Sequence, residues 1–343
     1  MLLMEGLQLE WQRWLPEIQD KEIVSIYFGG GTPALLSPSS IADIISWAKS
    51  NVKVSDDVEI TLEANPENID PLLMQEFAQA GINRASIGVQ TLDNYLLKKL
   101  GRIHDAKKAI EAVFLTKEAG IANISIDLMY DLPNQSLEAW KNTLKQAREL
   151  PITHLSLYNL TIEPQTVFFK YRNDIKHQLP DEQLSLEMYE LAVNMLNEAD
   201  LIQYEISAFA RDNMYSRHNV GYWTARPFLG FGPSAFSYWQ GRRFRNAANL
   251  SRYVKALQDG SSPIDFEEQL DVDAKRRELL TIELRLLAGV NLKEFQRKHG
   301  DLEASTQKTL ADLQAQGLIK INGHAALTKQ GILFYDTVAE ELI

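Results

Sequence analysis

The most constraining feature of the sequence is the repeated order of a short apolar strand followed by an amphipathic helix. Five segments are predicted to be strands: 22–28, 57–66, 83–90, 123–133 and 153–164. Predicted helices follow them at 37–50, 70–81, 91–102, 105–120, 136–150 and 181–199. Strands that alternate with helices form parallel sheets with right-handed crossovers, so we expect an α/β protein. Five repeats without a clear reversal fit a partial or open βα barrel at least as well as a doubly wound sheet.

Composition and charge exclude several classes of protein. The chain carries a net charge of -11, which argues against a nucleic-acid binder, because such proteins need a basic surface to displace counterions. It has no cysteine, so its own residues cannot form disulfides, thiol nucleophiles or cysteine-held zinc or iron–sulfur sites. The sequence has no membrane-spanning apolar run and no secretory leader at its start, and we therefore expect a cytoplasmic protein.

The sequence changes in character after residue 205. We expect residues 1–205 to form the barrel, and residues 206–275, rich in glycine, aromatic residues and arginine, to form a linker and aromatic region. Residues 276–343 contain helices, a hairpin and a final helix, which predicts a small α+β module of winged-helix type. A short basic run at 241–245 could contact an anionic small molecule.

Three consecutive glycines follow the first predicted strand. Gly29, Gly30 and Gly31 precede Thr32, and their lack of side chains lets backbone N–H and C=O groups approach a ligand closely. Such a turn can bind a small amino or carboxylate group. A tight turn with nothing bound explains the glycines at least as well. The run matches neither the phosphate-binding loop nor the dinucleotide fingerprint, because it lacks their spacing.

Polar side chains occur at or near the ends of the next strands. Glu63 could hold an ammonium group or a ribose hydroxyl, or it could cap its own loop. Gln90 ends the following strand, and its amide both donates and accepts hydrogen bonds. Asp127 lies inside an apolar strand and needs a partner, for which Arg102 is a candidate unless it serves as a carboxylate clamp. Because the carboxyl ends of parallel strands share one face, we expect these groups to form one site.

His218 lies in a run of aromatic and polar residues, 218–223. With Tyr222 and Trp223 nearby, its imidazole could bind haem iron axially, whereas a lone histidine more often makes a structural hydrogen bond. The histidines show no metal-binding spacing, so they predict no metal site of their own.

Several runs, taken together and in order, resemble the radical S-adenosylmethionine family of oxygen-independent coproporphyrinogen III oxidases and their relatives, the haem chaperones of HemW type. The runs are YFGGGTP, EANPE, NRASIGVQTLD, LLKKLGRIH, ISIDLMYDLPNQ, HLSLYNLTIEPQT, YEISAFA, SRHNVGYW and LTKQG. They cover nearly everything from about residue 20 to the end. The run HNVGYW is similar to the H-N-x-x-Y-W pattern of the chaperone branch, and this favours a haem chaperone over an oxidase.

The resemblance implies a partial parallel βα barrel that binds S-adenosylmethionine. The family positions that meet the methionine amino group are matched by Gly29, Gly30, Gly31 and Thr32. The positions that line the methionyl and ribose portions are matched by Glu63, Gln90, Arg102 and Asp127. The family's haem-binding histidine is matched by His218.

The chain departs from this family at its defining element. The family holds a 4Fe-4S cluster with a C-x-x-x-C-x-x-C motif after the first barrel strand, and this chain has no cysteine. We therefore expect a barrel that lacks its first strand, with segment 22–28 as an apolar edge. A shortened reading frame and a degenerate family member would each explain the loss. Two smaller departures are Asp131, where the family usually has glycine, and Phe236, where it usually has histidine.

The sequence thus predicts a haem chaperone that binds haem and delivers it to recipient haem proteins. One alternative is an oxygen-independent coproporphyrinogen III oxidase, whose radical decarboxylation of porphyrinogens this cysteine-free chain would not perform. A second alternative is a degenerate fragment that only binds S-adenosylmethionine. Haem or porphyrin and the recipient haem proteins are the expected partners, and nucleic acid is not. A homodimer and membrane-associated acceptors are left open.

Overall fold

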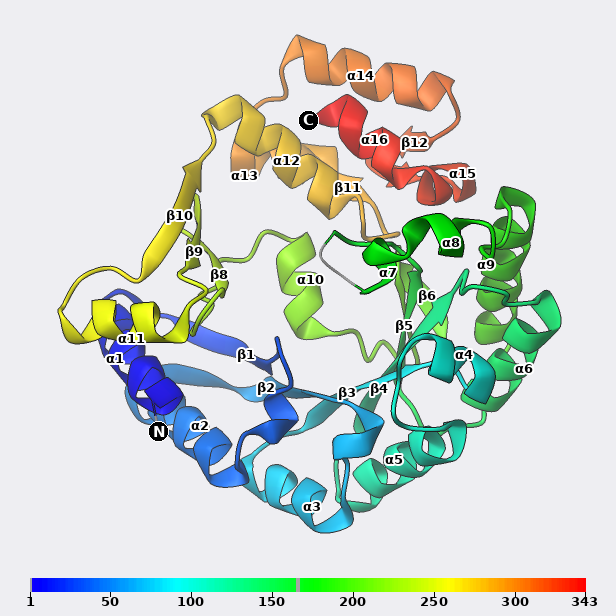
Figure 1. The fold of residues 1–343 in the computed structure, drawn as a ribbon. Helices are drawn as coiled ribbons and strands as arrows, with labels where there is room; N and C mark the ends of the chain where they lie inside the picture. The colour runs from blue at the N-terminus through cyan, green and yellow to red at the C-terminus, as the bar shows by residue number, and fades with distance from the viewer. Residues whose placement is uncertain (1, 165–166) are drawn as a thin grey trace. The chain divides into compact units, whose positions relative to one another are not determined.

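The structure is a computed structural model, and it describes residues 2–164 and 167–343. The chain divides into two compact units, whose elements Figure 1 labels in chain order. We call Ser25–Ile45 and Asp57–Ser216 the sheet unit. The second unit consists of Met1–Val24, Ser46–Asp56 and Arg217–Ile343. The three-part division expected from the sequence stays a prediction.

A seven-stranded sheet organises the sheet unit, in the order β1-β2-β3-β4-β5-β7-β6. Its strands are β1 (Glu22–Phe28), β2 (Lys53–Ala64), β3 (Arg84–Gln90), β4 (Asn123–Tyr130), β5 (His154–Asn159), β6 (Ile202–Glu205) and β7 (Ala208–Ala210). Strands β2 to β5 are parallel to one another and follow the order of the chain, which confirms the predicted α/β architecture. Both β1 and β6 are edge strands, so the barrel is open, and β1 is the edge that the sequence predicted.

The far end of the sheet differs from the wholly parallel arrangement that the sequence predicted. Strand β7 pairs with β5 in the antiparallel direction, and β6 pairs with β7 in the same way. Only residues 206–207 connect β6 to β7. A connection of this length makes a hairpin, because a parallel crossover needs a dozen or more residues. The sheet is therefore mixed.

Helices between the strands cover the outer face of the sheet (Figure 1). They include α2 (Pro38–Asn51), α3 (Pro71–Ala80), α5 (Ala106–Glu118), α6 (Leu137–Ala147) and α9 (Glu182–Asn197). The short elements η1 (Pro33–Leu35), η2 (Pro66–Asn68), α4 (Asn94–Lys99), α7 (Val167–Lys170) and α8 (Arg172–Lys176) lie in the connections between strands. Local residues explain their ends. In α3 the Asp70 side chain accepts hydrogen bonds from two backbone N–H groups of the first turn, and Gly81 ends the helix with a φ of 110°.

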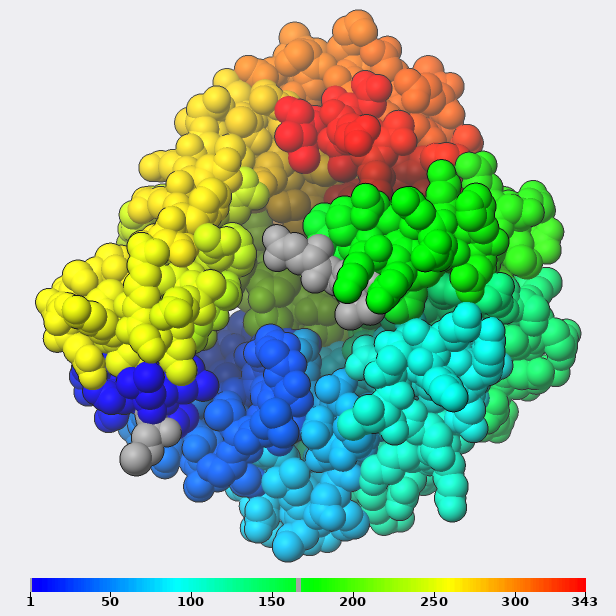
Figure 2. Space-filling view, viewed as in Figure 1, coloured from blue at the N-terminus to red at the C-terminus, as the bar shows by residue number. Residues whose placement is uncertain are grey.

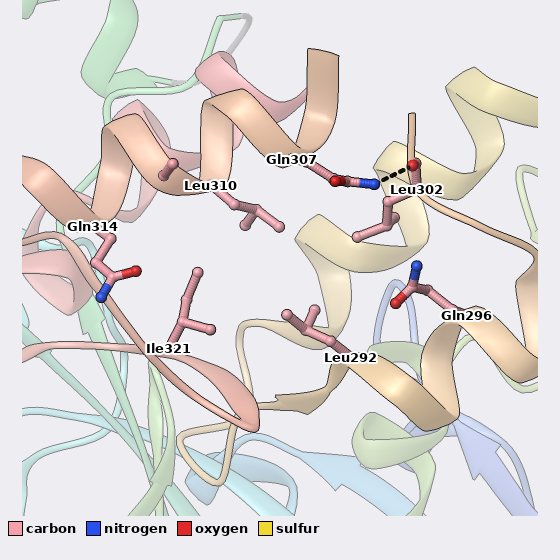
Figure 3. A pocket seen from close by; sticks show the side chains of 8 residues that line it. Leu292, Gln296, Leu302, Gln307, Leu310, Gln314 and Ile321 are labelled. Carbon is pink, nitrogen blue, oxygen red and sulfur yellow. Dashed lines mark hydrogen bonds between the residues drawn. The ribbon is translucent and has the colours of Figure 1, made fainter. Parts of the chain in front are cut away.

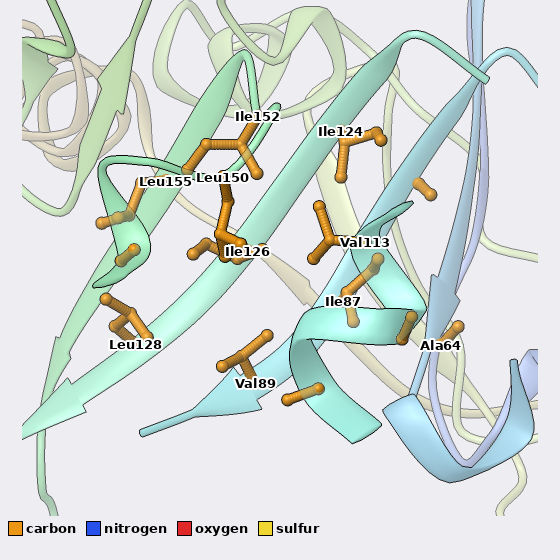
Figure 4. Packing of buried hydrophobic residues seen from close by; sticks show 14 of the residues in the cluster. Ala64, Ile87, Val89, Val113, Ile124, Ile126, Leu128, Leu150, Ile152 and Leu155 are labelled. Carbon is orange, nitrogen blue, oxygen red and sulfur yellow. The ribbon is translucent and has the colours of Figure 1, made fainter. Parts of the chain in front are cut away.

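Successive residues of the central strands face opposite sides of the sheet. One side is apolar: Ile60 and Leu62 of β2 are fully buried and belong to the main hydrophobic core. Figure 4 shows this core, in which Ile87, Ile124 and Ile126 of the strands pack near Val113 of α5. The alternate positions of the same strands carry polar side chains: Glu59, Thr61, Glu63, Arg84, Ser86, Ser125, Asp127, His154 and Ser156. The inner face of the open barrel is therefore polar, which is what a ligand site requires.

The second unit contains helices and two small sheets. Its elements are α1 (Leu2–Ile18), α10 (Arg217–Trp223), β8 (Phe236–Trp239), β9 (Arg242–Asn246), α11 (Leu250–Gln258), β10 (Ile264–Gln269), α12 (Val272–Glu283), β11 (Val290–Asn291), α13 (Leu292–His299), α14 (Ala304–Ala315), β12 (Ile319–Asn322), β13 (His324–Leu327), α15 (Lys329–Leu333) and α16 (Tyr335–Leu342). The hairpin of β12 and β13 and the helix after it confirm the prediction for the end of the chain. Within the described residues, no helix combines the length and the apolarity needed to cross a membrane.

The basic run at 241–245 is balanced within the second unit. Strand β10 pairs with β9 in the antiparallel direction and presents carboxylates opposite its guanidinium groups. Arg242 lies 2.9 Å from Glu267, and Arg245 lies 3.0 Å from Asp265. Arg243 pairs with the carboxylates of Glu268 and Glu278. These pairs account for the positive charge that the sequence had suggested for an anionic ligand.

Candidate functional site

A pocket of about 310 Å³ opens at the carboxyl ends of the parallel strands in the sheet unit. It is lined by Gly30, Gly31, Thr32, Pro33, Glu63, Ala64, Asn65, Ser86, Gly88, Gln90, Arg102 and Asp127. Seven of the eight residues predicted to contact S-adenosylmethionine are among them, and Gly29 is the eighth. The structure thus brings the predicted residues to one place, while their role in binding a cofactor stays a prediction.

The glycine turn is shaped by two different requirements. At Gly29, an added Cβ would lie 2.7 Å from the Tyr27 ring and 3.2 Å from the Glu63 carboxyl carbon, so only glycine fits there. At Gly30 the φ of 108° is a conformation that favours glycine. Gly31 has open space around it, and the segment that follows β1 lies on the surface in the view of Figure 2. The backbone of this turn is therefore accessible to a ligand.

Glu63 ties the glycine turn to β2. One carboxylate oxygen accepts a 2.6 Å hydrogen bond from the Tyr27 hydroxyl, and the other accepts a 3.2 Å bond from the Gly30 N–H. Burial and the Glu63 charge raise the pKa of Tyr27 above its ordinary range, so the phenol stays protonated and donates. The carboxylate thus caps the loop, as one interpretation of the sequence held, and lines the pocket as well.

Gln90 is placed by a distortion at the end of β3. The register with β4 shifts between Ile87 and Gln90, and bulges of this kind redirect side chains next to functional sites. Thr91 N–H donates a 2.8 Å bond to the Val89 carbonyl across Gln90, whose φ is 67°. This is a tight three-residue turn with a left-handed central residue, a strained arrangement.

Two neighbours of Gln90 were missed by the sequence reasoning. A Cβ on Gly88 would lie 3.0 Å from the Gln90 amide nitrogen and 3.3 Å from Asn65 Oδ1, so glycine makes room for both polar groups. An isolated glycine inside a strand signals a close approach of this kind, and Gly88 could have been found from it. Asn65 also accepts a 3.3 Å hydrogen bond from Arg102. Arg102 lines the pocket beside Asn65, and its hydrogen-bond partner there is Asn65 rather than Asp127.

Asp127 finds its partners among serines. It lies on β4 opposite Ser156 of β5, and it accepts hydrogen bonds from the hydroxyls of Ser156 and Ser86, the latter at 3.5 Å. Burial raises the pKa of Asp127 to about 6, and the nearby Glu63 carboxylate adds to the rise. A carboxyl group poised in this range can accept a hydrogen bond from a ligand hydroxyl when ionised.

Asp131 has a backbone conformation that agrees with the glycine expected there. Its φ is 61°, in the left-handed region that aspartate tolerates better than most residues. The carboxylate accepts hydrogen bonds from Asn159 at 2.6 Å and from Ser185 at 2.5 Å. These contacts join β5 and α9 to the end of β4, and Asp131 does not line the pocket.

His218 lies on α10 in the second unit, whereas the residues of the pocket belong to the sheet unit. Its Nε2 lies 2.7 Å from the Tyr222 hydroxyl, one helical turn further along. The Tyr222 ring contacts Phe228 edge to face, with ring centres 4.6 Å apart. The Arg285 guanidinium stacks on Trp223 at 4.2 Å. The imidazole and two aromatic rings of α10 are thus joined by the Phe228 ring and the Arg285 guanidinium group, while the haem role of His218 stays a prediction.

A second pocket, of about 290 Å³, lies between α13, α14 and β12 of the second unit (Figure 3). Leucines and three glutamines form much of its lining, and Gln307 donates a 2.8 Å hydrogen bond to the Leu302 carbonyl. It contains no charged side chain and no residue predicted for a site, so we do not treat it as the functional site.

The donor atoms of the chain do not fit an iron–sulfur cluster. Such clusters are held by cysteine thiolates, and the sequence has none. Among the described residues, no group of three or more histidine, aspartate and glutamate side chains could hold a metal ion either. The pocket in the sheet unit does offer the carboxylate, amide, guanidinium and backbone groups that recognise a polar nucleoside with an amino-acid tail.

Comparison with known proteins gives two family matches. The Radical SAM superfamily matches residues 8–147, and the HemN C-terminal domain matches residues 270–334. The heme chaperone HemW of Bacillus subtilis is 32% identical over 98% of this chain and 89% of its own length. HemW of Escherichia coli is 34% identical over 94% of this chain and 84% of its own length.

The fold has a counterpart among solved structures. The structure of HemN from Escherichia coli, a coproporphyrinogen III oxidase described as a radical SAM enzyme, superposes with a TM-score of 0.85. The match covers 99% of this chain and 82% of that chain, at 22% sequence identity. At this identity the comparison shows a shared fold, which agrees with the open α/β barrel and the smaller α+β part described above.

Proposed function

The chain belongs to the family of the heme chaperone HemW within the Radical SAM superfamily, and on that premise we propose that it binds haem and delivers it to recipient haem proteins. The observation that carries the proposal is the composition of α10, which combines His218 with Tyr222 and Trp223. Imidazole is a common axial ligand of haem iron, and aromatic rings pack well against a porphyrin face.

The surroundings of α10 support binding of an anionic porphyrin. Arg285 stacks on Trp223, and Arg226 donates a 2.6 Å hydrogen bond to the Arg217 carbonyl. An added Cβ on Gly221 would lie 2.2 Å from the Arg226 guanidinium, so glycine is what lets this cation pack over the helix. Guanidinium groups are suitable partners for the propionates of haem. Iron ligation through Nε2 of His218 requires the Tyr222 hydroxyl to release that atom.

Haem titration tests the proposal. Iron protoporphyrin IX is added to the protein and to the variants His218→Ala and His177→Ala, of which the second removes an exposed histidine of the sheet unit. We expect saturable binding with a defined Soret band for the protein and for His177→Ala. We expect weaker binding and a shifted Soret band for His218→Ala. An unchanged band and affinity in His218→Ala would exclude this histidine as the ligand.

Delivery is tested by mixing the haem-loaded protein with an apo haem protein. The chaperone function predicts that the Soret band of the acceptor grows while that of the donor falls. Haem transfer from this protein to the acceptor should be faster than haem transfer from haem-loaded albumin at the same haem concentration. Tight haem binding without transfer to the acceptor would show that the protein only binds haem, and it would argue against a chaperone function.

The pocket in the sheet unit would hold S-adenosylmethionine. Glu63, beside the turn at Gly30, offers its carboxylate to the ammonium group of the ligand's methionine part. Arg102 can pair with the carboxylate of that methionine part, and Asp127 can accept hydrogen bonds from the ribose hydroxyls. When bound to a reduced cluster, this cofactor supplies a 5′-deoxyadenosyl radical. The thiolates for that cluster are absent from this chain, so we propose binding alone and no oxidase activity for it.

Calorimetry with S-adenosylmethionine tests this second site independently of haem. We expect binding by the protein and by Glu76→Gln, which changes an exposed glutamate on α3. Glu63→Gln should bind more weakly, because it removes the negative charge beside the ammonium position and weakens the bond from Tyr27. Equal affinity in the two variants would contradict the assignment of Glu63.

A further inference from the structure

His104 is a buried histidine with no part in the site as assigned so far. It lies in the loop between α4 and α5, and its side chain is 0% exposed. Its Nδ1 lies 2.9 Å from Oε2 of Glu67 in η2. Its Nε2 lies 3.4 Å from the carbonyl oxygen of Val89 at the end of β3. The ring therefore bridges two segments that border the pocket.

The chemistry of these partners determines which ring atoms carry protons. A carbonyl oxygen can only accept a hydrogen bond, so Nε2 of His104 must donate to Val89. Nε2 therefore carries a hydrogen, while Nδ1 is engaged by the Glu67 carboxyl group.

The Val89 carbonyl is the acceptor that defines the turn at Gln90. It receives the Thr91 N–H at 2.8 Å in addition to Nε2–H of His104. Left-handed conformations of residues other than glycine persist only where the surroundings enforce them. The φ of 67° at Gln90 is thus held partly by a bond from another loop.

A second contact repeats the connection between the same two loops. Arg102, two residues before His104, donates to Asn65 Oδ1 at 3.3 Å, and Asn65 is two residues before Glu67. The loops 65–67 and 102–104 are therefore joined by two parallel contacts, Arg102 to Asn65 and His104 to Glu67. Gln90, Asn65 and Arg102 all line the pocket.

We propose that His104 is a positioning residue of the pocket: anchored on Glu67 through Nδ1, it donates from Nε2 to the Val89 carbonyl and holds the turn that directs Gln90 toward the ligand. This role rests on the proposed binding of S-adenosylmethionine at the same pocket. His104 acts through Val89 and Gln90 and does not line the pocket itself.

Two substitutions separate the two hydrogen bonds of the ring. In His104→Gln the side-chain amide nitrogen reaches about as far as Nε2 and can still donate to Val89. In His104→Asn it reaches only about as far as Nδ1, so contact with Glu67 is kept and the bond to Val89 is lost. Both variants remove the imidazole ring, so both lose the packing contacts of the ring and each serves as the control for the other.

Calorimetry and urea unfolding are measured on the full chain for both variants. We expect His104→Gln to bind S-adenosylmethionine within about threefold of the unchanged protein. His104→Asn should bind about tenfold more weakly, because it loses the hydrogen bond that holds the turn at Gln90. The two variants should unfold at similar urea concentrations. Equal affinities of the two variants would overturn the proposal, because a role in packing alone does not distinguish them.

Nitrogen NMR of the histidine rings provides a test that needs no ligand. With uniformly ¹⁵N-labelled protein and the His104→Gln variant for assignment, we expect Nε2 of His104 to carry a hydrogen, because the Val89 carbonyl can only accept. A ring whose Nε2 is unprotonated would overturn the proposal. If the unchanged protein binds no S-adenosylmethionine, the proposed function of the pocket is wrong, whereas the protonation of His104 is still decided by this spectrum.

Discussion

Replacing Asp127 with asparagine should make the protein more stable at neutral pH. Burial raises the pKa of this carboxyl from its ordinary value of 3.8 to about 6, with the Glu63 charge adding to the rise. The folded state thus binds the proton more tightly than the unfolded state does. The stability from this group is fully present below pH 3.8 and is lost as the pH rises through about 6.

The size of the effect follows from the shift. A difference of about two pKa units corresponds to about 3 kcal/mol of unfolding free energy, at 1.36 kcal/mol per unit. Asparagine keeps much of the shape and carries no charge to desolvate, so Asp127→Asn avoids this cost. The variant and the unchanged protein should have similar stability near pH 4. Their difference should grow in favour of the variant until about pH 7.

Urea unfolding between pH 4 and pH 7.5 measures the difference at each pH. The control is Asp43→Asn, which changes an exposed aspartate on α2 and should give a difference that varies little with pH. The stabilised Asp127→Asn variant should also bind S-adenosylmethionine more weakly, since it loses an acceptor in the pocket. A stability difference that does not change with pH, or one that favours the unchanged protein at pH 7, would refute the reasoning.

Two further substitutions test other parts of the structure. Gly88→Ala should weaken binding of S-adenosylmethionine with little change in far-ultraviolet circular dichroism, because its Cβ would displace the Gln90 amide 3.0 Å away and Asn65 3.3 Å away; unchanged affinity in calorimetry would contradict it. Tyr253→Phe should lower the unfolding free energy by about 1.5–3 kcal/mol, because its hydroxyl donates a 2.6 Å bond to the buried carboxylate of Glu10; a urea midpoint equal to that of the unchanged protein would show that the bond contributes nothing.

The regular part of the sheet unit was predictable because its strands and helices are long enough to show the spacing of apolar residues that is typical of each. Strand β3 was expected at 83–90 and is Arg84–Gln90, and β4 begins at Asn123 as expected. Strands β6 and β7 have four and three residues, too few for a pattern of alternation to stand out. Their hairpin depends on the pairing of β7 with β5, which no local sequence pattern predicts.

The site was predictable only where topology alone brings residues together. Glu63 and Gln90 meet at one pocket because parallel strands end at one edge of the sheet. Tyr27 was missed, because in the sequence it is an ordinary aromatic residue of a strand and its partner Glu63 is 36 residues away. The left-handed backbone of Gln90 was missed for a similar reason, since a bond from His104 helps to hold it.

The alternation along the central strands separates folding from recognition. Ile87 and Ile126 belong to the apolar core, whereas Ser86 and Asp127, their neighbours in sequence, line the pocket on the other side. Exchanging a residue of the polar side opens no void among the helices and so avoids the large penalty of a core deletion. The same fold can therefore acquire a pocket of different shape or charge through single substitutions, while the packing of the helices on the sheet stays unchanged.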